Sequence, residues 1–114
     1  MAARPRLLGL PYDASSSFLK GAAEAPPLIR AAIFSPHWNS WTEQFVDLAA
    51  ADGLSDGGDL ALTPDALARG NIEAGIEALL AEGWRPIALG GDHSVTYPVV
   101  RAMSRAHTPL TVLH

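Results

Sequence analysis

Cysteine is absent from the 114 residues of this chain. Its absence excludes disulfide bonds and thiolate chemistry, so a metal site would have to use histidine, aspartate and glutamate. A chain without disulfides also fits a reducing compartment, and we therefore expect a cytoplasmic protein.

The chain also lacks the features that indicate two large classes of partner. Its eight lysine and arginine residues are scattered and the formal net charge is −4, so no basic surface for nucleic acid is expected. No apolar stretch approaches the ~20 residues that span a bilayer, and Leu7–Pro11 is too short for the core of a signal peptide. The composition, 48% hydrophobic, is that of one globular domain, with neither nucleic acid nor membrane as a partner.

Apolar runs alternate with helical patterns along the chain. The helix that follows Thr63-Pro64-Asp65 has one apolar face and ends before Gly83, a residue favoured after a helix. Such alternation predicts βαβ units and a parallel sheet. The expected strands are Leu7–Leu10, Gln44–Leu48, Pro86–Leu89 and Leu110–Leu113; the expected helices are Leu28–Phe34, 64–82 and Ser94–Ala106; the expected loops include Tyr12–Gly21 and Asp52–Asp59.

The residues that best indicate chemistry are Gly90-Gly91-Asp92-His93-Ser94, directly after a predicted strand. Two glycines let the backbone turn sharply at the strand's carboxyl end, where a parallel sheet opens its crevice. His93 is then placed to bind a metal through a neutral imidazole. Asp92 can hold the turn, and either Asp92 or Ser94 can cap the next helix. From these residues alone, a turn with a capping aspartate and a surface histidine is the favoured interpretation, and the metal ligand is the alternative.

The segment Ile87–Thr96 closely resembles the first metal motif of the arginase, agmatinase and formiminoglutamase family. Further segments are similar to that family in the same order along the chain: Gly9–Asp13, Ser16–Phe18, Lys20-Gly21, Ala25–Arg30, Asp56–Asp59 and Val112–His114. The resemblance implies a three-layer α/β/α sandwich with a mainly parallel sheet, of which residues 1–114 form the N-terminal part of a single domain. One departure is the stretch Gly21–Pro26, which lacks an arginine and a second glycine that many members carry.

The resemblance also implies a metal and a reaction. His93 would be a ligand of one of two Mn²⁺ ions, and the other ligands would come from Asp-Ala-His-x-Asp and Asp-x-Asp motifs that this sequence does not contain. The implied reaction is hydrolysis of a guanidino or formimino carbon–nitrogen bond, with an agmatine-like substrate as first expectation and formiminoglutamate or arginine as alternatives. The implied protein is a homo-oligomer. Since one histidine cannot hold two dications, we expect a piece of a longer enzyme that is inactive alone, or a non-catalytic module.

Four further residues are candidates for the surroundings of the metal or the substrate. Asp92 and Ser94 flank His93, and His114 precedes the expected second motif, so each is expected to support a ligand rather than to be one. Asp13, followed by Ser15–Ser17, lies in the loop after the first strand and could face substrate, although a polar Asx turn explains it equally well. His37 and His107 are expected to be structural. A serine hydrolase is rejected because the chain has no Gly-x-Ser-x-Gly turn.

Overall fold

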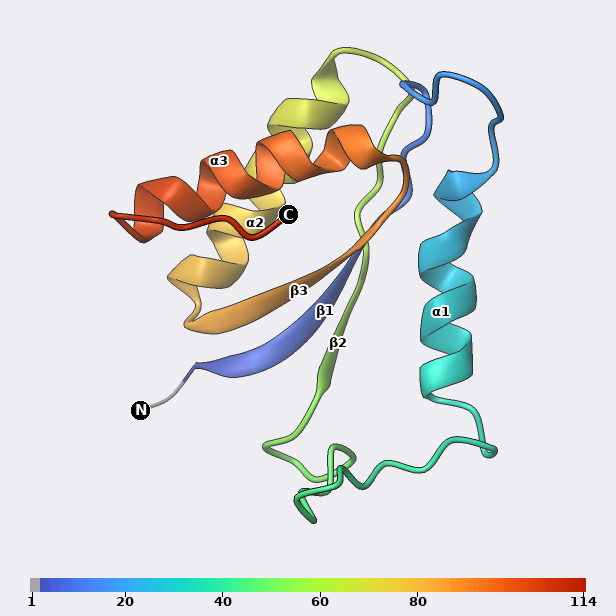
Figure 1. The fold of residues 1–114 in the computed structure, drawn as a ribbon, viewed down its shortest axis with the longest axis vertical. Helices are drawn as coiled ribbons and strands as arrows, with labels where there is room; N and C mark the ends of the chain where they lie inside the picture. Colours follow the sequence, from blue (N-terminus) through green and yellow to red (C-terminus); the bar gives the residue numbers. More distant parts are fainter. Residues whose placement is uncertain (1–2) are drawn as a thin grey trace.

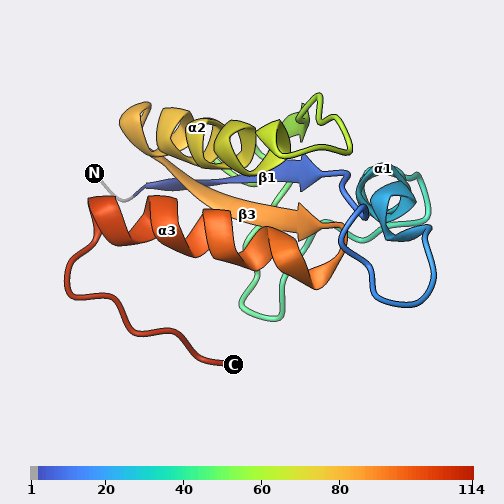
Figure 2. The ribbon, with the colours of Figure 1, turned by 90° about the horizontal axis from the view of Figure 1, so that it is seen from above.

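The computed structural model describes residues 3–114, which form three layers around a parallel sheet (Figure 1). The strands are β1 (Arg4–Leu10), β2 (Ser55–Asp59) and β3 (Trp84–Gly90), in the order β2-β1-β3. The helices are α1 (Ala25–Ile33), α2 (Leu67–Ala81) and α3 (Thr96–Ala106), preceded in two places by the short 3₁₀ turns η1 (Ala22–Glu24) and η2 (His93–Val95). Helix α1 covers one side of the sheet, while α2 and α3 lie together on the other (Figures 1 and 2). The predicted α/β class and parallel sheet are confirmed.

The hydrophobic core lies between β1 and the helix pair α2–α3. Leu8 and Leu10 of β1 are 4% and 0% exposed, and they pack with Ile72 and Ile76 of α2 and with Ala102 of α3. Alternate strand residues point to opposite faces, so the buried Leu7 lies on the α1 side. Burying each large apolar side chain stabilises the folded chain by about 1.5–3 kcal/mol. This packing fixes the position of the strand ends that carry the site.

An arginine connects α1 to the edge strand β2. The Arg30 guanidinium donates from Nε to Asp56 Oδ1 at 2.8 Å and from Nη2 to Asp59 Oδ1. Asp59 first, and then Asp56, raise the pKa of Arg30 above its usual value. A Cβ atom at Gly9 would collide with the Asp59 carboxylate and with the Arg30 guanidinium, so a larger residue there would displace this ion pair.

Three sequence-based predictions about local structure are wrong. Gln44–Leu48 is a turn in which Phe45 has a φ of 60° and only an isolated antiparallel bridge joins Trp41 to Asp47. Within the predicted loop Asp52–Asp59, the residues Ser55–Asp59 form strand β2, because their backbone pairs with β1 although they carry no apolar side chains. Leu110–Leu113 is not a strand, since no strand of the described part lies beside it.

Helix α2 also begins later than predicted. It starts at Leu67 rather than directly after Thr63, and Asp65 Oδ1 accepts a hydrogen bond from the Leu67 backbone N–H at 2.9 Å. The carboxylate therefore satisfies a free amide of the first turn, the function that the sequence suggested for Thr63. No helix among residues 3–114 has the length and apolar character that crossing a bilayer requires.

Candidate functional site

The predicted site lies at the carboxyl ends of β1 and β3, where the chain leaves the sheet. Gly91 has a φ of 43°, and a Cβ atom there would stand 2.4 Å from the carbonyl oxygen of Tyr12 and 2.6 Å from that of Leu10. The Asp92 backbone N–H donates to the Tyr12 carbonyl at 2.8 Å. The turn after β3 is thereby joined to the loop after β1, and only glycine permits the close approach.

Asp92 is the buried hydrogen-bonding centre of the site. Its residue exposure is 9%, and its Oδ1 accepts from the Ser94 N–H at 2.9 Å and from the Ser94 hydroxyl at 2.5 Å. Its Oδ2 accepts from the Ser15 N–H at 2.9 Å. Of the two residues predicted to cap the following turn, Asp92 is therefore the cap and Ser94 a donor to it. With both oxygens engaged, Asp92 holds the turn and the β1 loop in place.

His93, by contrast, is exposed and can be reached from two sides. Its Nδ1 lies 3.3 Å from the Thr96 hydroxyl in the next helical turn. On one side is a hollow of about 420 Å³ lined by residues of β3 and α3, among them Ala88 and Val99. On the other is a hollow of about 330 Å³ lined by the residues 15–19. A ligating histidine usually has its second ring nitrogen held by such a partner, so the geometry fits a metal ligand.

The loop after β1 is held by two charged residues. Lys20 donates from Nζ to the carbonyl oxygens of Asp13, Ala14 and Ser16, at 2.9, 2.8 and 3.3 Å. The Asp13 carboxylate accepts from the Gly21 N–H at 2.6 Å and from the Ala23 N–H at 3.3 Å, and these bonds lower its pKa. Asp13 thus closes its own loop at the start of η1, which favours the structural alternative for this residue. Lys20 belongs to a segment that resembles the family, but the sequence did not predict that it holds this loop, because its acceptors are all backbone oxygens.

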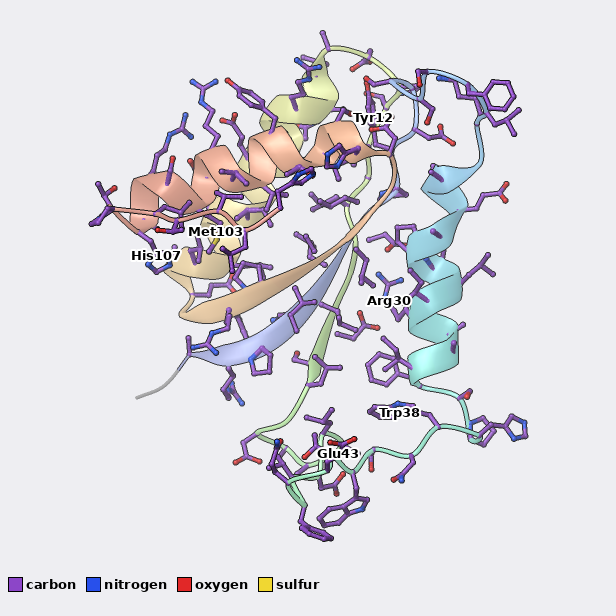
Figure 3. The ribbon with its side chains drawn as sticks, viewed as in Figure 1. Tyr12, Arg30, Trp38, Glu43, Met103 and His107 are labelled. Atoms are coloured by element: carbon purple, nitrogen blue, oxygen red, sulfur yellow. The ribbon has the colours of Figure 1, made fainter. Side chains whose placement is uncertain are left out.

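The segment that follows α3 places His114 beside His93. The two imidazole rings are stacked, with centroids 5.5 Å apart and an angle of 26° between their planes. His107 lies at the opposite end of α3 from Tyr12 and the site (Figure 3), and its N–H donates to the Met103 carbonyl as the helix ends. Across residues 3–114, no three histidine or carboxylate side chains are grouped so that they could hold one metal ion.

Comparison with known proteins gives one family. A model of the arginase family matches residues 3–114. Arginase 2 of Arabidopsis thaliana, a chloroplastic and mitochondrial protein, is 40% identical over 117 residues, covering 95% of this chain and 34% of its own length. The mitochondrial agmatinase of Gallus gallus is 34% identical over 110 residues, covering 94% and 32%. The chain thus spans about a third of the curated relatives that it matches.

Solved structures agree with the fold. Proclavaminate amidino hydrolase from Streptomyces clavuligerus superposes with a TM-score of 0.83 at 28% identity, over 99% of this chain and 38% of that one. The formiminoglutamase of Trypanosoma cruzi, solved with Mn²⁺, gives a TM-score of 0.75 at 26% identity, over 93% and 36%. Similarity therefore covers almost the whole of this chain and the corresponding part of larger proteins.

Proposed function

Because the chain belongs to the arginase family, we propose that it provides His93 as the first metal-ligating residue of a manganese-dependent hydrolase that cleaves a guanidino carbon–nitrogen bond. The observation that supports this most is the exposed imidazole at the carboxyl end of β3, with Thr96 at its Nδ1 and hollows on both sides. The position agrees with the rule that ligands of open α/β sheets bind beyond the carboxyl ends of the strands.

Arginine is the first proposed substrate. The plant arginase is 40% identical to this chain and the animal agmatinase 34%, over similar lengths. This order favours the arginase alternative over the agmatinase expectation from the sequence. Agmatine is the second candidate and a formimino substrate the third, since a formiminoglutamase shares the fold at lower identity. We further propose that the whole protein is cytoplasmic and homo-oligomeric.

The residues of this chain would prepare the site rather than complete the reaction. When bound, a pair of manganese ions supplies a nucleophile by lowering the pKa of a water molecule, and it orients the substrate. His93 contributes one neutral imidazole ligand, and Thr96 restrains its ring. Asp92 keeps the turn at the strand end by accepting hydrogen bonds from Ser94 and Ser15. The remaining ligands would have to come from residues other than 1–114.

The isolated chain should accordingly lack activity. Manganese prefers oxygen ligands, and a single imidazole does not neutralise or hold two dications. We expect no urea release and only weak Mn²⁺ binding by the 114-residue chain in calorimetry. Tight binding of two Mn²⁺ ions would contradict the proposal that the remaining metal ligands come from residues other than 1–114.

A chimaera tests the proposal directly. Residues 3–114 would replace the corresponding segment of the Arabidopsis arginase, and urea release from arginine and from agmatine would be measured with Mn²⁺. We expect activity with arginine that falls by at least about 100-fold in His93→Ala, because even indirect supports of metal ligands contribute 10–100-fold. His107→Ala, at the far end of α3, is the matched control. A folded, manganese-loaded but inactive chimaera would favour a non-catalytic module instead.

A further inference from the structure

The loop between β1 and α1 forms one wall of a hollow beside His93. Residues 15–19 line that hollow together with residues 92–94, and its volume is about 330 Å³. The Ser15 N–H donates to Asp92 Oδ2 at 2.9 Å and so joins the wall to the turn that carries His93, and the two segments lie side by side in Figures 1 and 2. The shape of the hollow therefore depends on what holds residues 15–19 in place.

Lys20, the only lysine of the chain, holds the base of this wall. Its Nζ donates to the carbonyl oxygens of Asp13, Ala14 and Ser16 at 2.9, 2.8 and 3.3 Å. An ammonium group has three N–H donors, and these three acceptors use them all. Carbonyl dipoles that converge on one point repel one another, so a cation at their centre stabilises the curl of the loop. Lys20 therefore closes the loop but has no donor left for a ligand in the hollow.

Packing contributes little to the position of the wall. Phe18 and Leu19, which lie just before Lys20, are 88% and 71% exposed, so these apolar side chains are not held by the core that residues 3–114 form. The remaining contacts are polar: the Asp13 carboxylate accepts from two amides beyond Lys20, and the Ser16 N–H donates to the Asp13 carbonyl at 3.0 Å. The ammonium group of Lys20 is thus the main support that a single substitution can remove.

We propose that Lys20 is a positioning residue whose ammonium group sets the width of the hollow between residues 15–19 and His93, and thereby the affinity for substrate, without contacting metal or substrate. The kinetic consequence rests on the proposed hydrolase function, whereas the hold on the loop does not. Arginine is not an equivalent replacement, because its guanidinium is a planar fork and the three carbonyls converge on a compact point charge.

The kinetic test uses Lys20→Met in the chimaera with the Arabidopsis arginase. We expect KM for arginine to rise about tenfold, the effect of losing roughly one charge-assisted hydrogen bond. Turnover (kcat) and Mn²⁺ affinity should stay unchanged, because the variant loses binding that ground state and transition state share. Agmatine, which lacks the carboxylate of arginine, should show the same rise in its KM or inhibition constant. A rise confined to arginine would mean that Lys20 binds the substrate carboxylate directly, and it would overturn the positioning role, as would an unchanged KM.

Two matched variants separate geometry from charge. Lys20→Arg keeps the charge but not the compact ammonium group, so KM should remain above that of the parent chimaera. Arg69→Met removes one positive charge from the exposed surface of α2 and should leave KM unchanged. An equal rise in Lys20→Met and Arg69→Met would show that net charge, rather than the loop, controls substrate affinity.

Hydrogen exchange in the 114-residue chain provides a readout that does not need activity. The Ser15 and Ser16 amides are hydrogen-bonded within the loop or to Asp92, and in Lys20→Met they should exchange about tenfold faster, while the amides of α2 keep their rates. Unchanged exchange would overturn the proposal whether or not the chimaera is active. Faster exchange together with an inactive parent chimaera would support the hold of Lys20 on the loop and contradict the hydrolase function, so the two failures are distinguishable.

Discussion

Two apolar runs of similar composition adopt different structures in this molecule, and only the first is a strand. Leu7–Leu10 lies in the middle strand of the sheet, and its three leucines are between 0% and 4% exposed. Leu110–Leu113 follows α3 without regular structure, and Leu113 is 94% exposed. The difference lies in neighbours: β1 has β2 on one side, β3 on the other and helices on both faces, whereas no strand of the described part pairs with the later run.

Strand β2 supplies the converse case. Ser55–Asp59 has no apolar side chain, yet it is a strand because β1 offers it backbone partners and Arg30 binds two of its aspartates. An apolar run is therefore neither necessary nor sufficient for a strand here. Strand propensity acts through packing against neighbours rather than through the backbone alone.

The largest effect is expected from truncating a leucine of Leu7–Leu10, the run that lies in the middle strand of the sheet. Leu10→Ala removes a side chain that is fully buried against α2 and α3, and such changes cost about 2–5 kcal/mol. Leu113→Ala makes the same chemical change at an exposed position and should alter the free energy of unfolding by less than about 0.5 kcal/mol. Urea unfolding followed by circular dichroism measures both, and equal destabilisation by the two variants would contradict the comparison.

A smaller loss is expected where the loop after β1 is joined to the turn after β3. Asp92→Ala leaves the Ser15 and Ser94 amides and the Ser94 hydroxyl without their shared acceptor. We expect a loss of about 1–3 kcal/mol in the free energy of unfolding, since these part-buried hydrogen bonds would lose their acceptor. Hydrogen exchange at the Ser15 and Ser94 amides should accelerate. Ser94→Ala keeps the two backbone bonds and should cost less; if it equals Asp92→Ala, the carboxylate is not the connection between the two segments.

Self-association should depend on the outer edge of β3, which has no partner strand within residues 3–114. Strand β3 pairs with β1 on one side only, and Ile87 on it is 41% exposed. We expect the 114-residue chain to associate, and Ile87→Lys to reduce the association because an edge lysine opposes strand pairing. Leu28→Lys adds the same charge on exposed α1 and is the control. Light scattering measures both, and a monomeric parent chain at high concentration would show that the edge is harmless.

Sequence reasoning succeeded where a local pattern and its tertiary environment agree. The apolar run before Gly90 became β3, and the two glycines formed the turn that positions His93. It failed for β2, whose strand structure comes from the backbone of β1, and for Leu110–Leu113, whose composition favours a strand that has no partner in the described part. It also missed the hydrogen bonds by which Lys20 holds the loop and the contact between His93 and His114, because neither carbonyl acceptors nor ring proximity leaves a periodic signal.

The smallest effect concerns the pH dependence of the loop that follows β1. Hydrogen bonds from the Gly21 and Ala23 amides lower the pKa of Asp13 below 3.8, so the carboxylate stabilises the folded loop above the unfolded pKa. That contribution should be lost as the pH falls through the lower, folded value. The amide resonance of Gly21 should therefore titrate with an apparent pKa below 3.8, and Asp13→Asn should abolish the transition. Asp52→Asn, in an exposed turn, should leave it unchanged. A Gly21 transition that survives in Asp13→Asn would mean that another group controls this loop, and the Ser15 amide, held by Asp92, would then be the next position to follow.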